Sequence, residues 1–493
     1  MTAVGWAVSV RPWRRLPARK VLIVGGAFVL LIVAGAGAAS PGLLRFGAAV
    51  SITAVFMAAC LKCPRHVVLA VVVWLAAFGT LRRVLLPDGV SGDADPLLLV
   101  APATAALLGL VAVASGAFTR PTSFAKAVTA FAALVLAAAL NPLQGGLSVG
   151  AGGLLFVFVP LLWFWIGRAV IDENLMATIF RLVSLLSLAA AVYGLLQVYN
   201  GFPGWDQRWI DTKGYAALRV GESIRPFASF SSSSEYVSFL AIGMLLWACR
   251  LGKRSSIIPS AAALTLLGWA LAVASVRGAL VVVPIALAIT YATSRGFGIG
   301  RTALAGIAAL FLLGVVVSGL DPGVAGGQPS AALVSRQVTG LSDPFNRQTS
   351  TLPLHVDALV TGLQDGIRNP LGRGLGVITL AGQKFGADNE NVSTDVDPSN
   401  VAVAMGLPGL LLYGAVVLIA MRLCFRMARQ ERSYLSLAVL GVALVTLFQW
   451  LNGGNYSVAP LIWMSLGWLD RHSAVVPLGR SVLTLRSNPA SSR

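Results

Sequence analysis

Apolar residues gather into long stretches that follow one another along almost the whole chain, separated by short polar turns. A helix that crosses a bilayer needs about 20 mainly apolar residues. Because many stretches reach or approach that length, the pattern predicts an all-α, polytopic membrane protein with about 12–14 transmembrane helices. The predicted spans are residues 21–39, 42–60, 67–81, 97–117, 127–140, 147–167, 177–199, 236–249, 257–275, 278–294, 302–320, 401–421, 434–451 and 457–469.

Two polar segments interrupt this pattern, residues 200–235 and residues 321–400, and we expect both as loops on the outer side of the membrane. The second is far longer than a connection between two helices requires, and such loops are commonly functional. Within it, residues 351–368 have apolar positions at helical spacing, which predicts an amphipathic helix that ends at residues 369–370. A compact glycine turn follows at residues 372–376.

The composition agrees with a membrane protein. Hydrophobic residues make up 57% of the 493 residues and charged residues 11%, with a mean hydropathy of +0.80. These values exclude an ordinary soluble globular protein. No linker separates a soluble domain, so we expect residues 1–493 to form one integral membrane domain with a polar cytoplasmic tail at residues 473–493.

The charges predict the orientation. The net charge of +18 comes from 37 Lys and Arg residues against 19 Asp and Glu residues. If the arginine-rich N-terminus faces the cytoplasm, most basic residues fall on the cytoplasmic side and most acidic residues on the outer side, as the positive-inside rule requires. Both termini are then cytoplasmic. Contact with anionic lipid headgroups explains the basic excess, so nucleic acid is not expected as a partner.

Ionisable residues at the outer edge of the membrane are the candidates for chemistry, because charges are costly there. Arg225 lies just before the span at 236–249, and Arg277 lies in a very short turn between two spans. Asp395 and Asp397 come just before the span at 401–421. Two guanidinium groups could hold a diphosphate, and a carboxylate could take the proton from an attacking hydroxyl group. This chemistry would need no metal or other cofactor, because the arginines supply the positive charge.

Other interpretations of these residues stay open. Each arginine could be an anchor that reaches the headgroup region, and each aspartate could be an acid favoured at a helix N-terminus. The Asp-x-Asp spacing of Asp395 and Asp397, repeated at Asp93 and Asp95, also fits a metal-dependent glycosyltransferase. Further candidates for substrate binding are Glu235, Arg347, Arg373 and Asn400.

Five short stretches are distinctive by their order, spacing and expected outer placement: Tyr193–Gln197 (YGLLQ), Arg225–Phe230 (RPFASF), Ser275–Ala279 (SVRGA), Asn369–Gly376 (NPLGRGLG) and Gly406–Leu410 (GLPGL). Together they resemble the O-antigen ligase and O-antigen polymerase (Wzy-like) family of bacterial integral membrane glycosyltransferases. The likeness covers about residues 190–415 and includes a many-span, GT-C-like architecture.

The resemblance implies inverting, metal-independent transfer of a glycan from a polyprenyl-diphosphate-linked oligosaccharide at the outer leaflet of the bacterial plasma membrane. Arg225 and Arg277 would correspond to the two diphosphate-binding arginines of the family. Ligases of the family carry a histidine about eleven residues before the position of Gly406, where this chain has Asp395. That departure favours a polymerase that extends an acceptor glycan, with Asp395 or Asp397 as the base. A chain-length regulator or a flippase is a candidate protein partner.

Alternatives to this polymerase remain, including a peptidoglycan polymerase of the shape-and-division type and a chain that has lost its base and only binds glycan lipid. Within the enzyme class, the chain could transfer the lipid-linked glycan to another acceptor, as a ligase does. Outside it, a chain with so many spans could be a transporter or flippase for lipid-linked glycans. Transporters usually place ionisable groups near the membrane midplane, and the sequence has no acid deep within a predicted span. We therefore expect an enzyme.

Overall fold

The structure is a computed structural model. It describes residues 41–85, 95–213, 219–220, 223–252, 254–318, 329–348, 350–379, 394, 396–451 and 456–475. The span predicted at 21–39, most of the predicted tail at 473–493, and Asp395 lie outside these ranges.

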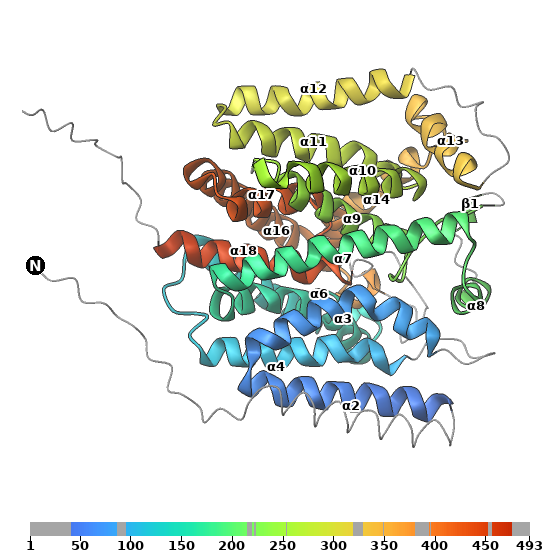
Figure 1. Cartoon of the computed structure of the whole chain (residues 1–493). Coiled ribbons are helices and arrows are strands. Elements are labelled where there is room, and N and C mark those ends of the chain that lie inside the picture. Colours follow the sequence, from blue (N-terminus) through green and yellow to red (C-terminus); the bar gives the residue numbers. More distant parts are fainter. Residues whose placement is uncertain are drawn as a thin grey trace, which may run out of the picture.

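The fold is a bundle of helices packed side by side, with most of the smaller elements at one end (Figure 1). The helices of the bundle are α2 (Pro41–Lys62), α3 (Pro64–Val84), α4 (Val100–Ala114), α5 (Ser123–Ala138), α6 (Leu147–Val170), α7 (Glu173–Tyr199), α9 (Ser233–Ala248), α10 (Ile257–Val273), α11 (Arg277–Ser294), α12 (Ile299–Ser318), α16 (Asp397–Glu431), α17 (Tyr434–Val445) and α18 (Val458–Val475). The remaining elements are η1 (Pro96–Leu99), η2 (Pro142–Gln144), α8 (Gly204–Lys213), β1 (Arg219–Val220), β2 (Ser223–Ile224), η4 (Arg254–Ser256), α13 (Pro329–Ser342), α14 (Leu352–Arg368) and η6 (Gly376–Ile378). α8, the antiparallel β1–β2 pair and α13 lie at the same end of the bundle, which we call the α8 end.

Each predicted span from 42–60 onward overlaps a helix, and the amphipathic helix predicted at 351–368 is confirmed as α14. Within the described ranges, seven segments are long and apolar enough to cross a membrane: most of α2, then α3, η1 with α4, α6, α7, α11 and α16. Helices α5, α9, α10 and α17 are apolar but shorter, as is the apolar part of α12 (Ile299–Leu312). The chain is therefore an all-α, multi-pass membrane protein.

Close backbone contact between α6 and α18 forms the centre of the bundle. A β-carbon added to Gly167 would lie 2.3 Å from the carbonyl oxygen of Met464, and one added to Gly467 would lie 2.0 Å from that of Phe164. Each helix thus presents a glycine to the backbone of the other. Small residues permit this approach, which strengthens packing where lipid gives no hydrophobic drive between helices.

Helix α16 is broken at Gly406, and the predicted glycine turn occupies the break. Gly406 has φ of +60°, so the helix ladder is interrupted there. The carbonyls of Val403 and Ala404 lose their helical partners at the break. They accept hydrogen bonds from the amides of Arg373 (2.8 Å) and Gly374 (3.0 Å) instead.

The other side of the same turn contacts the connection between α5 and α6. The side-chain amide of Asn141 donates to the carbonyl of Gly372 (2.9 Å), and the amide of Gly376 donates to Oε1 of Gln144 (3.0 Å). Stretches that are far apart in the sequence therefore form one interlocked unit, with the glycine turn between the α5–α6 connection and the break in α16.

The span predicted at 434–451 is wrong at its end. Helix α17 ends at Val445, and the chain turns over the following six residues although several of them are apolar. The start of α16 holds this turn. The amide of Asp397 donates to the carbonyl of Phe448 (2.8 Å), and its carboxylate accepts the amide of Leu451 (3.0 Å). Hydrophobic periodicity does not register such a turn because its cause lies elsewhere in the chain.

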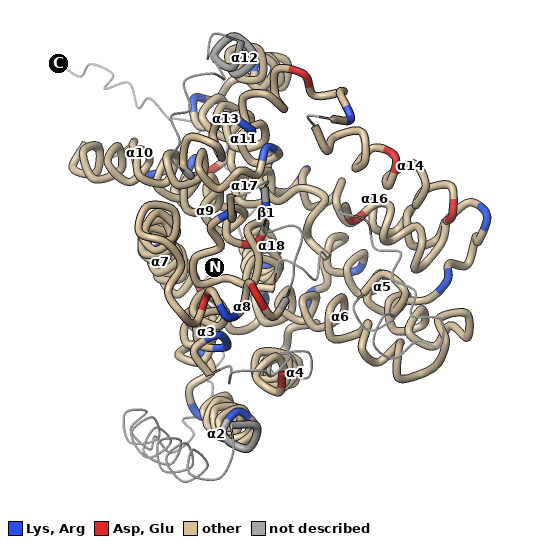
Figure 2. Tube along the Cα trace, turned by 90° about the vertical axis from the view of Figure 1, so that its right-hand side faces the viewer, with Lys and Arg blue, Asp and Glu red and all other residues tan. Residues whose placement is uncertain are grey.

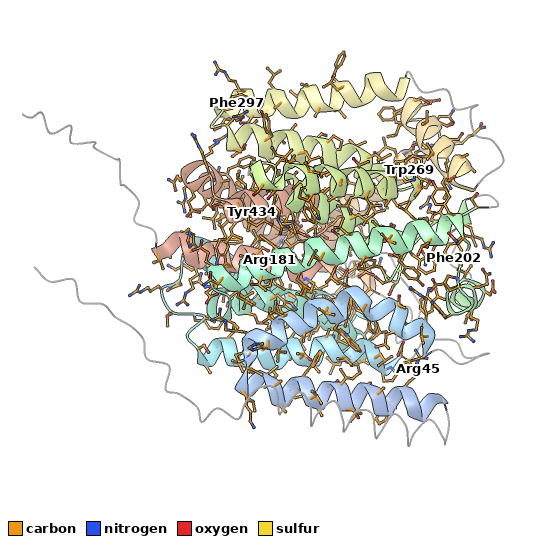
Figure 3. The ribbon with its side chains drawn as sticks, in the orientation of Figure 1. Arg45, Arg181, Phe202, Trp269, Phe297 and Tyr434 are labelled. Carbon is orange, nitrogen blue, oxygen red and sulfur yellow. The ribbon has the colours of Figure 1, made fainter. Side chains whose placement is uncertain are left out.

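Basic residues occupy helix ends at the opposite end of the bundle, including Lys62 of α2, Arg168 of α6 and Arg429 of α16. Arg168 is buried there and forms an ion pair with Asp470 of α18. Figure 3 shows the two ends: Phe202, Trp269 and Arg45 lie toward the α8 end, whereas Phe297 and Arg181 lie toward the opposite end.

Candidate functional site

Arg225 lies at the α8 end between strand β2 and helix α9. The strand pair positions it from one side, with Arg219 opposite Ile224 and Val220 opposite Ser223. The half-buried Arg225 has an enclosed Nε atom with no hydrogen-bond partner among the described residues. Its guanidinium is thus partly withdrawn from solvent with part of its donor capacity unused.

Arg277 begins helix α11 directly after the turn that leaves α10. Ser275 in that turn is buried and has φ of +54°, a conformation that non-glycine residues rarely adopt and that makes the turn tight. The predicted short turn is therefore present, and Arg277 is half-buried at the α8 end. The first turn of α11 contains no acidic residue. The partial positive charge of the amides at the helix N-terminus therefore adds to the positive charge of Arg277.

Helix α13 brings a third arginine, Arg336, to the other two. Leu333 of α13 is fully buried against Val198 of α7 and Val273 of α10, which fixes the helix on the bundle. Nη2 of Arg277 donates to the carbonyl of Arg336 (3.1 Å). Figure 2, which looks on to the α8 end, shows basic positions around α13, α11 and β1.

A glycine of α13 makes this approach possible. A β-carbon added to Gly340 would lie 2.0 Å from Cζ of Arg277, so the guanidinium of Arg277 lies directly against the helix backbone. By contrast, a β-carbon added to Gly278, the next residue of α11, would meet nothing within 4 Å. Gly340 is therefore required for the present place of Arg277.

The three arginines form an electropositive cluster that we call the arginine cluster. Burial lowers the pKa of Arg225 to about 10, with further lowering from the positive charges of Arg336 and Arg277. Burial also lowers the pKa of Arg336. Among the residues that the structure describes, no carboxylate forms an ion pair with any member of the cluster. Uncompensated charge of this kind is costly in the free protein and favours an anionic ligand.

Of the two predicted acids, the structure describes Asp397 alone. Asp397 is buried in the first turn of α16, where its carboxylate accepts hydrogen bonds from Tyr413 (2.7 Å) and from the amide of Leu451. These contacts hold the α17–α18 connection and do not involve the arginine cluster. Asp395 lies outside the described residues, but its neighbour Thr394 is bound by Asn400. The Asn400 side chain accepts the Thr394 amide (2.7 Å) and donates to its carbonyl (2.8 Å).

The remaining candidates lie apart from one another. Glu235 is buried in the first turn of α9, and its carboxylate accepts the amides of Ser457 (2.7 Å) and Ser231 (3.2 Å). Arg347 forms an exposed ion pair with Asp357 (2.8 Å). The half-buried Arg373 belongs to the glycine turn.

The sequence interpretation brought together Arg225 and Arg277 but missed Arg336. Arg336 is a single arginine in a short apolar helix of the long polar segment. Its sequence context does not distinguish it from the other arginines of that segment. Within the described residues, no group of three or more His, Cys, Asp or Glu side chains could hold a metal ion. Compared with protein-family models and with curated proteins, the chain matches none.

Proposed function

We propose that this protein is a glycan polymerase of the bacterial plasma membrane. It joins polyprenyl-diphosphate-linked oligosaccharide repeats into a surface polysaccharide at the outer leaflet, with the α8 end facing outward. The observation that carries the proposal is the convergence of Arg225, Arg277 and Arg336 without a described acidic partner. The basic helix ends at the opposite end of the bundle support this orientation.

A lipid diphosphate matches the charge and the place of the arginine cluster. Arginine binds phosphate oxygens through paired hydrogen bonds and keeps its charge at physiological pH. The amides at the start of α11 add a favourable field for the same anion. A diphosphate carried on a polyprenyl chain also stays at the membrane surface, which is where a cluster at the ends of spanning helices can reach it.

The proposed reaction transfers the glycan from the diphosphate to a hydroxyl group of the acceptor glycan. The hydroxyl oxygen attacks the anomeric carbon, the bond from that carbon to the diphosphate oxygen breaks, and the configuration inverts. The leaving diphosphate takes the bonding electrons and is stabilised by the arginine cluster. Asp395 takes the proton of the attacking hydroxyl group.

The direct test is transfer by the full-length protein in lipid nanodiscs, using lipid-linked repeats extracted from the host and mass spectrometry of the products. Arg225→Ala and Arg277→Ala are expected to abolish polymer formation while both variants remain folded. Arg65→Ala is the control, because Arg65 is exposed and pairs with Asp172 at the opposite end. Polymer formation at the control level by either cluster variant would contradict the proposal.

Mass spectrometry of lipid-linked glycans from a strain that lacks the gene distinguishes a polymerase from its alternatives. Single repeats that accumulate at the outer leaflet are the expected result. Long glycans that remain on the lipid would instead identify a ligase-like enzyme. Repeats retained at the inner leaflet would identify a flippase.

The base is tested by comparing Asp395→Asn with Asp397→Asn. Asp395→Asn is expected to reduce turnover by roughly 100-fold or more, because a general base contributes about that factor. Asp397→Asn is expected to act mainly on stability through the α17–α18 connection. The reverse order of turnover would assign the base to Asp397. Activity is expected to survive EDTA, and its restoration by added Mn²⁺ or Mg²⁺ would favour the metal-dependent interpretation of the Asp-x-Asp spacing.

A further inference from the structure

The segment after Arg225 is buried although it forms neither helix nor strand. Phe227 and Ala228 are fully buried, and Phe230 is nearly so. Ala228 has φ of +46°, which a residue with a side chain rarely adopts. Because this backbone has no regular ladder, its amides and carbonyls need partners from elsewhere in the molecule.

Two side chains of the bundle supply those partners. Arg83 of α3 donates from Nη1 to the carbonyl of Phe230 (2.5 Å) and from Nη2 to the carbonyl of Ala228. Gln197 of α7 accepts through Oε1 the amides of Phe227 (3.1 Å) and Ala228 (2.8 Å). The guanidinium of Arg83 also lies over the ring of Phe227, 4.7 Å from its centroid.

Asp206 of α8 orients both side chains. Its Oδ1 accepts from Nε of Arg83 (2.6 Å), and its Oδ2 accepts from Nε2 of Gln197 (2.7 Å) and from the hydroxyl of Tyr193 (2.6 Å). A glutamine amide can present either its oxygen or its nitrogen to a neighbour. Because an ionised carboxylate only accepts hydrogen bonds, Asp206 draws Nε2 toward itself and leaves Oε1 for the amides of residues 227 and 228.

We infer that Arg83, Gln197 and Asp206 are positioning residues for Arg225, which act by fixing the backbone of residues 227–230. They do not touch the ligand. They hold the segment that anchors Arg225 so that its guanidinium stays beside Arg277 and Arg336. The inference rests on the proposed function only in taking a diphosphate as the ligand of the arginine cluster.

The protein contains a matched control for this role. Asp206 and Arg83 have side chains that are 0% and 1% exposed, and Asp470 and Arg168 at the opposite end have side chains that are 1% and 3% exposed. Both pairs are buried Arg–Asp pairs whose arginine also donates to backbone carbonyls. If both pairs are purely structural, breaking either one should change stability and ligand affinity in the same way. If Asp206 positions Arg225, only the loss of the Arg83–Asp206 pair should weaken ligand affinity.

The experiment measures binding of farnesyl diphosphate, a short polyprenyl diphosphate, to the full-length protein in nanodiscs by calorimetry. Asp206→Asn and Asp470→Asn are expected to lower the melting temperature by similar amounts. Asp206→Asn is also expected to weaken affinity about tenfold and to speed amide hydrogen exchange in peptides covering residues 225–232. Asp470→Asn is expected to keep wild-type affinity. Gln197→Met, which keeps the Arg83–Asp206 pair, is expected to weaken affinity by a similar factor and decides the matter if Asp206→Asn does not fold.

The outcomes separate the two proposals. Wild-type affinity in Asp206→Asn and Gln197→Met, together with weak binding by Arg225→Ala, would overturn the positioning role and leave the proposed site intact. Wild-type affinity in Arg225→Ala, or no binding by the wild type, would overturn the diphosphate site itself. Equal weakening of farnesyl diphosphate affinity by Asp206→Asn and Asp470→Asn would show that Arg83, Gln197 and Asp206 contribute only to the stability of the fold.

Discussion

Two sets of arginines in this protein differ in what surrounds their guanidinium groups. Arg83 at the α8 end and Arg168 at the opposite end are deeply buried, and each has a carboxylate and backbone carbonyls as partners. Arg225 and Arg277 are half-buried beside Arg336 and face no described carboxylate. A buried charge whose partner is removed is strongly destabilising. The paired arginines therefore serve the fold, whereas the arginine cluster is arranged for a charge that the protein itself does not supply.

The difference is tested most strongly by truncating one arginine of each kind. Arg83→Ala is expected to lower the free energy of unfolding by about 3–5 kcal/mol, because the carboxylate of Asp206 is left buried without its cation. Arg225→Ala is expected to leave stability unchanged or raise it, while polymer formation is abolished. Thermal unfolding and transfer assays on the same nanodisc samples check both. Equal destabilisation by the two variants would show that Arg225 is structural.

Replacing an arginine of the cluster with lysine tests the geometry of binding at constant charge. Arg277→Lys is expected to weaken farnesyl diphosphate binding by roughly tenfold, because lysine lacks the fork that donates two parallel hydrogen bonds. Arg65→Lys, at an exposed ion pair of the opposite end, serves as the control and should bind normally. Full affinity in Arg277→Lys would mean that the cluster acts only through its net charge.

A methyl group can displace Arg277 without removing its charge. Gly340→Ala is expected to weaken farnesyl diphosphate binding about fivefold, because the new β-carbon would overlap the guanidinium. Gly278→Ala is the matched control: it makes the same substitution in a helix, but its β-carbon would meet nothing within 4 Å. If the two variants bind equally, the contact between α13 and Arg277 has no part in ligand binding.

The smallest expected effect is a pH dependence. Since the pKa of Arg225 in the free protein is about 10, its charge is lost as pH rises through that value, while the diphosphate stays fully ionised. Farnesyl diphosphate affinity is therefore expected to fall about twofold between pH 8 and pH 10 and more steeply above it. Calorimetry over this range provides the measurement. A decline of the same size in Arg225→Ala would assign the titration to another group.

The sequence was sufficient to predict the helices because the length of an apolar stretch is a local property. Predicted spans at 147–167 and 177–199 reappear as α6 and α7, each a few residues longer. The end of α17 was not predictable in the same way. The turn after Val445 depends on hydrogen bonds to Asp397, a residue of a different helix.

The sequence predicted only those residues of the site that can be recognised from their own local sequence. Arg225 and Arg277 lie at the edges of apolar stretches. Because a charge at the edge of a membrane costs free energy, each of them is a candidate for function from the sequence alone. Arg336 joins them because Leu333 packs on α7 and α10, a contact that no periodicity contains. Likewise, Arg83 and Asp206 are 123 positions apart in the chain, and their pairing follows from the packing of α8 on α3.

The glycine turn inside the break of α16 has a consequence for biosynthesis. The carbonyls that receive its amides, those of Val403 and Ala404, are translated after the turn itself. The turn therefore cannot complete its hydrogen bonds until the ribosome has passed them and α16 has entered the bilayer. Helix α14, whose Gly362 and Gly366 lie against Ser399 and Ala402 of α16, is thus synthesised together with the turn before the helix that holds both of them, and both are held in place only once α16 has been inserted.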